Sequence, residues 1–245
     1  MEFLNQTAMI TGAAVGIGRA VTTQLVKSGA NVIALDVDAE KLAALEQELA
    51  EYSRQVLCVI CDVRDPAAVS NAADQGIQCF GKIDILVNNA ALWRHSSPFQ
   101  EISLEDWKTF MDINVMGVVH CTRAVLPYMI ENNYGRIVNV ASVAGVYGNA
   151  NMSHYSATKG AVIAMTKALA KELAQKGITV NAVSPGSVST SKNPDMDFYK
   201  ETGLAYMGRT GTDRENADLI CFLASKKASY ISGQNIQIDG CRKEI

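Results

Sequence analysis

Seven short apolar runs recur along this chain, and segments with helical spacing separate them. Strands that are apolar on both faces need cover on both sides, and strands that alternate with helices pair as a parallel sheet. The pattern predicts an α/β fold: a single doubly wound, Rossmann-type domain over residues 1–245, with a seven-stranded parallel sheet and helices on both faces. The expected strands are residues 7–11, 31–36, 55–63, 83–90, 135–142, 178–186 and 235–240.

Composition fits one large domain and excludes several classes of protein. Of the 245 residues, 48% are apolar, which rules out a disordered or fibrous chain. The net charge of −3, from 22 basic and 25 acidic residues without a basic run, argues against a nucleic-acid partner. We find no targeting leader and no uncharged apolar run of bilayer length, so we expect no membrane attachment and a cytoplasmic location.

The six cysteines form no framework of paired spacings. Cys58 and Cys61 make a C-x-x-C, but in an expected strand their side chains point to opposite faces, which suits neither a disulfide nor a metal. A zinc site would also need a second pair. We expect buried thiols and no metal.

A glycine-rich turn, TGAAVGIG, follows the first expected strand and opens the first helix. Gly12, Gly16 and Gly18 allow a tight turn and close approach of a ligand, and a helix N-terminus offers N–H groups to a pyrophosphate. The spacing is G-x-x-x-G-x-G rather than the common G-x-G-x-x-G. The turn can therefore bind a pyrophosphate in the same way, although its sequence differs from the common motif.

Asp36 ends the second expected strand. A carboxylate there accepts hydrogen bonds from both ribose hydroxyls of an adenosine and repels a 2′-phosphate. No lysine or arginine occupies residues 13–17 or 37–40, so we expect NAD rather than NADP. The alternative role, capping the next helix, suits Asp38 better.

Asp62 and Val63 end the third expected strand. Their position allows contact with the adenine ring. Capping of the following helix, where Pro66 marks the first turn, is an equally good account of Asp62.

Tyr155 and Lys159 lie four residues apart in the segment SHYSATKG. On a helix they are separated by about 40° around the axis and about 6 Å along it, so they share a face. A nearby ammonium favours the phenolate, which predicts a lowered tyrosine pKa and an acid–base catalyst at neutral pH. The small neighbours Ser156, Ala157 and Gly160 leave room for cofactor and substrate.

Two further residues belong with this pair. Ser142 ends the fifth expected strand, where its hydroxyl can donate to a developing oxyanion. Asn114 falls in mid-helix, where asparagine is disfavoured, so we expect it to hold a water or to shape the helix beside the lysine.

Together these residues resemble the short-chain dehydrogenase/reductase family, over essentially the whole chain. The resemblance rests on TGAAVGIG, on NNA at residues 88–90, on the set Asn114, Ser142, Tyr155 and Lys159, and on SPG at residues 184–186. It implies an NAD-dependent enzyme that transfers a hydride between the cofactor and a small secondary alcohol or ketone.

The resemblance also implies individual roles. Tyr155 would be the general acid/base, Lys159 would lower its pKa and bind the nicotinamide ribose, Ser142 would hold the substrate carbonyl, and Asn114 would anchor a water of a proton relay. The implied cofactor-binding residues are Gly12, Gly16, Ile17, Gly18, Asp36, Asp62, Val63, Asn89, Ala90, Tyr155, Lys159, Pro185, Gly186, Val188 and Thr190.

The chain departs from the family pattern at two places. Ala91 follows NNA where glycine is usual, which makes the path of the loop toward the substrate less certain. Cys241 stands in DGC where DGG is usual, near a region in which partner subunits often meet.

Two loops and a polar segment are expected around the substrate. Trp93, Arg94 and His95 either contact a polar or anionic substrate or form an ordinary exposed loop, and Tyr147, Asn151 and His154 flank the catalytic set. Residues 187–212 are the expected substrate lid; an ordinary packed helix is the alternative for its bulky side chains, which are Met196, Phe198, Tyr199, Tyr206 and Met207.

Small residues line one side of the helix that starts near residue 156. They are Ala157, Ala161, Ala164 and Ala168. Such a stripe permits close helix–helix approach, and the resemblance implies a homodimer or homotetramer; an internal packing face is the alternative. The competing function is an NAD-binding sensor or scaffold without turnover, and an enoyl reductase is disfavoured by the tyrosine–lysine spacing.

Overall fold

The computed structural model describes residues 1–93, 96–190 and 200–243, and these form a seven-stranded parallel sheet. The strand order is β3-β2-β1-β4-β5-β6-β9. Every strand expected from the sequence is present and none is reversed, so the predicted doubly wound topology is confirmed. The strands are β1 Thr7–Thr11, β2 Asn31–Asp36, β3 Val56–Ile60, β4 Ile85–Asn88, β5 Gly135–Val140, β6 Ile178–Pro185 and β9 Asn235–Ile238.

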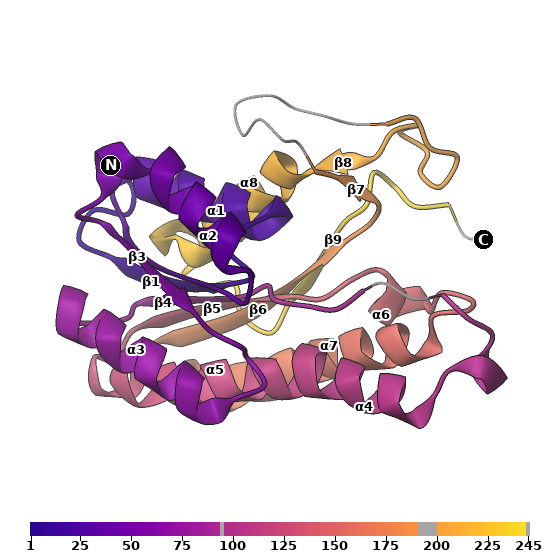
Figure 1. Ribbon diagram of the computed structural model, residues 1–245, viewed down its shortest axis with the longest axis horizontal. Helices are drawn as coiled ribbons and strands as arrows, with labels where there is room; N and C mark the ends of the chain where they lie inside the picture. The colour runs from indigo at the N-terminus through magenta and orange to yellow at the C-terminus, as the bar shows by residue number, and fades with distance from the viewer. Residues whose placement is uncertain (94–95, 191–199, 244–245) are drawn as a thin grey trace.

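Helices cover both faces of this sheet, as Figure 1 shows. On one face lie α1 Gly16–Lys27, α2 Ala39–Glu48 and α8 Asp213–Ala224. On the other lie α3 Pro66–Phe80, α4 Leu104–Met111, α5 Gly117–Glu131 and α7 Ser153–Leu173, and the short α6 is Ala144–Tyr147. Single turns are η1 Ala50–Tyr52, η2 Phe99–Glu101, η4 Ala174–Lys176 and η5 Lys226–Ala228, with a π-helical turn, η3, at Asp112–Met116.

Local signals in the sequence explain where several helices begin. The side chain of Asp38 caps α2, and that of Asp65 caps α3, whose first residue is Pro66. Thr212 and Glu215 form a reciprocal capping box at the start of α8. These caps satisfy N–H groups that a helix cannot pair internally.

The two helical layers bury two separate apolar clusters against the sheet. One joins β1, β2 and β5 to α1, α2 and α8, and the other joins the opposite face of the sheet to α3, α5 and α7. Gly76 lets α3 lie close to β2, because a Cβ at that position would come within 2.0 Å of Ile33 Cδ1. Burial on both faces explains why these strands are apolar along their whole length.

The strand order reverses direction at β1. From there the chain builds outward to β2 and β3, then returns to add β4 and the later strands on the other side. Parallel sheets of this kind form a crevice at the carboxyl ends of the strands on either side of this point. The glycine-rich turn after β1 lies at that crevice.

A two-stranded sheet, which the sequence did not predict, lies within residues 187–212. It pairs β7, Val188–Ser189, with β8, Gly211–Thr212. Of the expected lid, residues 200–210 form turns and isolated bridges rather than a helix, and Tyr206 and Met207 are exposed. Met196, Phe198 and Tyr199 lie outside the described residues, as do Arg94 and His95.

One helical run among the described residues, Leu104–Glu131, is long and apolar enough to cross a membrane by length and composition alone. Core helices of globular domains pass the same test, and the inner side of this run is buried in the domain at Phe110, Cys121 and Met129. All six cysteines are free thiols, and burial raises the pKa of Cys58 and of Cys61 to about 11. The described residues contain no group of three or more histidine, cysteine or carboxylate side chains placed to hold a metal.

Candidate active site

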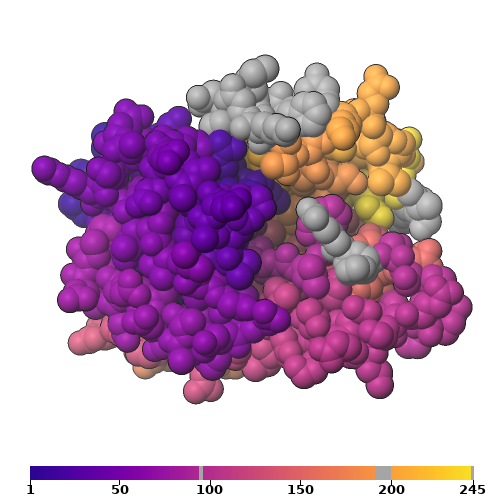
Figure 2. Space-filling model, in the orientation of Figure 1, coloured from indigo at the N-terminus to yellow at the C-terminus, as the bar shows by residue number. Residues whose placement is uncertain are grey.

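A pocket of about 990 Å³ runs along the carboxyl edge of the sheet. In Figure 2 the N-terminal part of the chain, indigo to purple, and later parts, magenta and orange, stand on either side of a hollow on this face. Most of the residues expected to bind the cofactor or to act in catalysis line the pocket. They are Gly12, Gly16, Ile17, Asp36, Asp62, Val63, Asn89, Ala90, Ser142, Tyr155, Lys159, Pro185, Gly186, Val188 and Thr190.

Gly18, expected at the cofactor, instead packs beneath the glycine-rich turn. A Cβ on Gly18 would lie 2.0 Å from the carbonyl oxygen of Gly12 and 2.6 Å from Asn89 Nδ2. Asn89 braces the same turn, because its Nδ2 donates to the carbonyl oxygens of Thr11 and Gly12 at 3.0 and 2.9 Å. Gly18 therefore shapes the turn and is not part of the pocket wall.

The first turn of α1 suits an anionic group. The N-cap residue is Val15, whose side chain makes no capping hydrogen bond, so the first N–H groups of α1 are left for another acceptor. Gly16, with φ of +55°, stands at the pocket wall beside Thr190. This uncapped N-terminus between glycines fits the pyrophosphate of a dinucleotide.

Asp36 lies where an adenosine ribose is expected. One carboxylate oxygen accepts from the N–H of Ala14 and the other from the N–H of Asp38, both at 3.0 Å. Asp38, and not Asp36, caps α2 through the N–H of Lys41. The capping alternative for Asp36 is therefore wrong, and its fixed carboxylate faces the pocket.

Basic side chains also reach this end of the pocket, which corrects one premise of the cofactor prediction. Lys41 directly follows residues 37–40, which contain no lysine or arginine. It lines the pocket together with Arg64. Lys41 pairs with Asp38, and the guanidinium of Arg64 binds both carboxylate oxygens of Asp62. Each of these cations is thus partly balanced by its own carboxylate.

Asp62 and Val63 line the pocket at the end of β3. Asp65 caps α3, so the capping role considered for Asp62 is wrong. The Arg64 hydrogen bond holds the pKa of Asp62 below its usual value, so this carboxylate is charged at neutral pH.

Tyr155 and Lys159 meet in the pocket on α7, as their spacing predicts. Lys159 Nζ lies 5.8 Å from the centre of the Tyr155 ring and donates to the carbonyl oxygen of Val140 at 2.7 Å. The lysine is 3% exposed. Phe110 packs edge-on against the tyrosine ring, with centroids 6.5 Å apart, and so helps to set its orientation.

The protein's own groups shift the tyrosine pKa in the direction opposite to the one expected. Burial raises the pKa of Tyr155, and the hydrogen bond with Ser142 lowers it by less. The lysine is itself affected, because burial lowers the pKa of Lys159 to about 8. Desolvation disfavours the charged form of either group, and it is the main cause of both shifts.

Ser142 lies at the end of β5, where the chain enters α6. It is buried, contacts the Tyr155 phenol through a hydrogen bond, and accepts from the N–H of Ala144 at 3.1 Å. The hydroxyl is therefore fixed beside Tyr155 in the pocket, where the sequence places it.

Asn114 lies behind the pocket wall, in the π-helical turn η3. Its Oδ1 accepts from the N–H of Leu92 at 2.7 Å, and its Nδ2 donates to the Leu92 carbonyl at 2.8 Å and to Thr158 Oγ1 at 3.1 Å. The side chain thus fastens the loop after β4 to α7. This supports the shaping role considered from the sequence, and a π turn at this point is typical of functional sites.

The short helix α6 packs closely against α7 beside Tyr155. Gly145 in α6 is so close to α7 that a Cβ on it would lie 2.5 Å from the Lys159 carbonyl carbon and 2.7 Å from Gly160 N. Ser156 Oγ accepts from the N–H of Asn149 at 3.1 Å. Ser156, Ala157 and Gly160 do not line the pocket, so they do not make the room for ligands that we expected.

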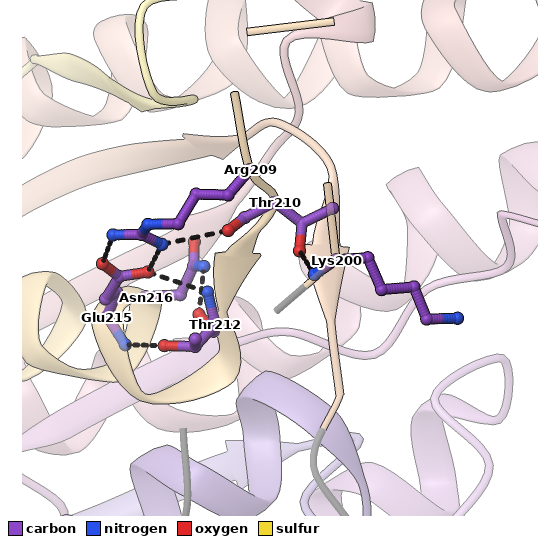
Figure 3. A network of polar contacts seen from close by, with 6 residues as sticks. All are labelled: Lys200, Arg209, Thr210, Thr212, Glu215 and Asn216. Carbon is purple, nitrogen blue, oxygen red and sulfur yellow. Dashed lines mark hydrogen bonds and ion pairs between the residues drawn. The ribbon is translucent and has the colours of Figure 1, made fainter. Parts of the chain in front are cut away.

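The region expected to pack around the nicotinamide is supported by the β7–β8 pair. Thr210 Oγ1 contacts Ser189 Oγ at 2.8 Å and accepts from the N–H of Lys200 at 3.0 Å. Arg209 binds both oxygens of Glu215, which lies in the capping box of α8, and holds the pKa of that carboxyl at about 2 (Figure 3). This network joins the two described ends of the expected lid to α8.

Several residues at the substrate end differ from those expected. Tyr147, Asn151 and His154 do not line the pocket; His154 is buried against Phe110, with ring centroids 4.1 Å apart. Asn149, Met152 and Arg242 line it instead, together with Trp93. The departure at DGC draws attention to the C-terminal turn, but spacing alone does not bring Arg242 to the pocket.

The alanine stripe of α7 does not pack inside this domain. Ala157, Ala164 and Ala168 are exposed and Ala161 is half-buried. The alternative of an internal packing face is therefore wrong for this chain.

Comparisons with known proteins point in one direction. A family profile described as short chain dehydrogenase matches residues 6–197. The chain is similar to a 3-oxoacyl-acyl-carrier-protein reductase of Thermotoga maritima, with 41% identity over 98% of each chain. It is also similar to a 2-dehydro-3-deoxy-L-rhamnonate dehydrogenase (NAD(+)) of a Sphingomonas species, with 37% identity over 98% of this chain and 96% of the relative.

A solved structure of the same family is also similar to this chain. A crystal structure from Brucella melitensis, described as a short-chain dehydrogenase/reductase and glucose/ribitol dehydrogenase, superposes with a TM-score of 0.86. It is 33% identical in sequence, and the match covers 98% of this chain and 97% of that one.

Proposed function

We propose that this chain, which belongs to the short-chain dehydrogenase/reductase family of oxidoreductases, uses NAD to interconvert a secondary alcohol and a ketone. One observation carries the proposal. Tyr155, Ser142 and Lys159 line one end of a pocket whose other end holds the glycine-rich turn and Asp36. A proton-transfer group thus shares a single pocket with residues suited to a dinucleotide.

The reaction divides between a hydride and a proton. A bound nicotinamide supplies or accepts the hydride. Tyr155 gives a proton to the substrate oxygen when a ketone is reduced, or takes one from the hydroxyl when an alcohol is oxidised. Ser142 donates a hydrogen bond to the same oxygen as negative charge develops there.

The raised pKa of Tyr155 keeps the phenol protonated at neutral pH. In this state the residue is ready to donate a proton, which favours ketone reduction. Below a pH of about 8, Lys159 is the ammonium ion, and its buried charge stabilises the phenolate that donation leaves behind. Asn114 positions α7 through Thr158, between Tyr155 and Lys159.

Asp36 supports NAD as the preferred cofactor. Its carboxylate is fixed by two backbone N–H groups at the adenosine end, where it would accept from ribose hydroxyls and repel a phosphate. The Sphingomonas relative is described as an NAD(+) enzyme. Lys41 and Arg64 oppose this preference, but each is engaged by a carboxylate.

Residues 187–212 are proposed to act as the substrate lid, and the exposed alanine stripe of α7 as a subunit interface of a homodimer or homotetramer. The stripe supports the second proposal because small exposed residues let two helices approach closely, and light scattering of the purified protein tests it. We expect the enzyme in the cytoplasm, with a small alcohol or ketone as substrate and neither nucleic acid nor membrane as a partner.

A panel of alcohols and ketones, assayed with NAD(H) and NADP(H) in parallel, tests the function. Turnover detected as NADH absorbance, with NAD(H) used better than NADP(H), is the expected result. Tight NADH binding without turnover of any compound would instead support a sensor or scaffold.

A further inference from the structure

Arg242 reaches the catalytic end of the pocket from the C-terminal turn. After β9 the chain reverses at Gly240 and Cys241, which both have positive φ angles of 64° and 59°. Residues 241–243 then run antiparallel to residues 204–207, with a bridge between Ala205 and Arg242. The N–H of Tyr206 donates to the Cys241 carbonyl, and the N–H of Lys243 to the Leu204 carbonyl, both at 2.9 Å. The backbone of Arg242 is thus held on both sides.

The side chain is held as well, by a neutral partner. Arg242 Nη2 donates to Asn149 Oδ1 at 3.0 Å, and the N–H of Asn149 donates to Ser156 Oγ at 3.1 Å. Ser156 follows Tyr155 in α7. This chain of contacts ties the half-buried guanidinium to the turn of helix that carries the catalytic tyrosine.

The charge of Arg242 has no ion-pair partner among the residues that the structure describes. Arg19, Arg64 and Arg209 each pair with a carboxylate, whereas Arg242 contacts only an amide oxygen. Asp239 lines a small neighbouring cavity together with Arg242, but no ion pair joins the two described side chains, and Asp239 Oδ1 accepts from the N–H of Cys241 at 3.1 Å. A guanidinium has five N–H donors in a planar fork, so most of its hydrogen-bonding capacity is left for a ligand.

The distribution of charge along the main pocket points the same way. The carboxylates on its described wall, Asp36 and Asp62, follow β2 and β3, whereas Arg242 follows β9 at the opposite edge of the sheet. The ionisable groups near Arg242 on that wall are Tyr155 and Lys159. This end of the main pocket therefore carries positive charge, and no described carboxylate lines its wall there, which favours an anion.

We propose that Arg242 binds a carboxylate of the substrate, so that the enzyme acts on hydroxy acids and oxo acids in preference to neutral alcohols and ketones. This assignment rests on the proposed function and names its substrate class. The planar fork of the guanidinium matches a carboxylate through two parallel hydrogen bonds. Asn149 holds the fork in place, so that binding the carboxylate orients the reacting carbon toward Tyr155.

The test compares acids with their methyl esters, which differ by one charge and keep the same hydroxyl. Binding of 2-, 3- and 4-hydroxy acids and of the esters is measured by calorimetry, with and without NADH, for the wild type and for Arg242→Gln. We expect the wild type to bind one of the acids at least tenfold more tightly than its ester. Arg242→Gln should weaken binding of that acid by roughly 10- to 150-fold and leave the ester within about twofold.

Two further variants separate charge from structure. Arg242→Lys should restore part of the preference for the acid, because it keeps the charge and loses the fork. Lys243→Gln removes the neighbouring cation, which lies over the Tyr206 ring and does not line the pocket, and should change nothing. Melting temperatures of all variants check that the C-terminal turn remains folded.

Equal binding of acid and ester by the wild type, including no measurable binding of either, overturns the proposal. A preference that survives in Arg242→Gln overturns it as well. Failure of the proposed function is seen separately, as absence of NADH binding or of turnover. Tyr155→Phe should lower kcat/KM by roughly 10²- to 10⁴-fold and keep the preference for binding the acid.

Discussion

The amine of Lys159 lies 5.8 Å from the centre of the Tyr155 ring, and its hydrogen bond goes to the carbonyl oxygen of Val140. The lysine is thus fastened to the end of β5 while it lies beside the Tyr155 ring on the same helix. Burial acts on both groups, raising the pKa of the tyrosine and lowering that of the lysine to about 8. Burial of this cation should lower the stability of the fold, whereas its charge is proposed to support catalysis. One substitution can test both effects.

Replacing Lys159 with methionine should stabilise the protein and remove its activity. At pH 7 the lysine is charged in both the folded and unfolded states, and the folded state bears the desolvation penalty, on the order of 1–3 kcal/mol after allowing for the hydrogen bond to Val140. As the pH rises from about 8 to 10.5, the folded lysine loses its proton before the unfolded one, so the wild type gains stability over the variant.

Urea unfolding at pH 7 and at pH 10 measures this difference. Lys167→Met, at an exposed position on the same helix, is the control and should change neither stability nor its pH dependence. A Lys159→Met protein that is less stable than the wild type at both pH values would contradict the prediction.

Replacing Tyr155 with phenylalanine should lower kcat/KM by roughly 10²- to 10⁴-fold, because the proton donor is lost and the ring is kept. NADH affinity, measured by fluorescence titration, should stay within about threefold. Tyr147→Phe is the matched control, since Tyr147 is 54% exposed and does not line the pocket. Substantial turnover by Tyr155→Phe would remove the tyrosine from the mechanism.

Replacing Asp36 with asparagine should reduce the preference for NAD over NADP by roughly 10- to 100-fold. The substitution removes the negative charge that repels a 2′-phosphate and leaves one oxygen for the Ala14 or Asp38 N–H. The ratio of kcat/KM with the two cofactors measures the effect. Asp65→Asn, at the cap of α3 and away from the pocket, should keep the wild-type ratio; an unchanged ratio in Asp36→Asn would show that this carboxylate does not select the cofactor.

Replacing Glu215 with glutamine should cost about 1 kcal/mol at pH 7, because the bidentate pair with Arg209 is broken. The side chains are 34% and 39% exposed, so solvent screens the pair and limits its worth. The folded pKa of Glu215 is lowered to about 2, so the stabilisation is complete above the unfolded value of 4.5 and disappears as the pH falls from there toward 2.

Thermal melts between pH 7 and pH 2 follow this loss. The difference between the wild type and Glu215→Gln should shrink with acidification, whereas Glu172→Gln, an exposed change on α7, should give no difference at any pH. If the wild type is still more stable than Glu215→Gln at pH 2, the loss of stability comes from the capping box and not from the ion pair with Arg209.

The sequence predicted the sheet because each strand is buried on both faces and is therefore apolar throughout. It also located the pocket, since residues at the ends of parallel strands gather at one edge. Pairing of Val188–Ser189 with Gly211–Thr212 was not predicted, because two-residue strands carry no periodicity. The direction of the Tyr155 pKa was wrong, since desolvation depends on the enclosure of the phenol, which helical spacing does not report.

Arg242 shows a second limit of such prediction. It follows the last strand by four residues and reaches the pocket only because residues 204–207 pair with the C-terminal turn. Nothing in the local sequence indicates that pairing. Asn149, which accepts its hydrogen bond, lies between α6 and α7, in a segment that the sequence placed beside the pocket through Tyr147, Asn151 and His154 but not through Asn149.

Thr210 contacts both Ser189 and Lys200, so these two residues, eleven apart in the chain, lie close to the same point of the domain. When the two ends of a segment are held together, the entropic cost of closing the segment grows only slowly with its length. Evolution can therefore exchange or lengthen that stretch at little expense to the rest of the molecule. Proteins with this fold can therefore come to bind different substrates while the residues proposed to transfer the proton stay in place.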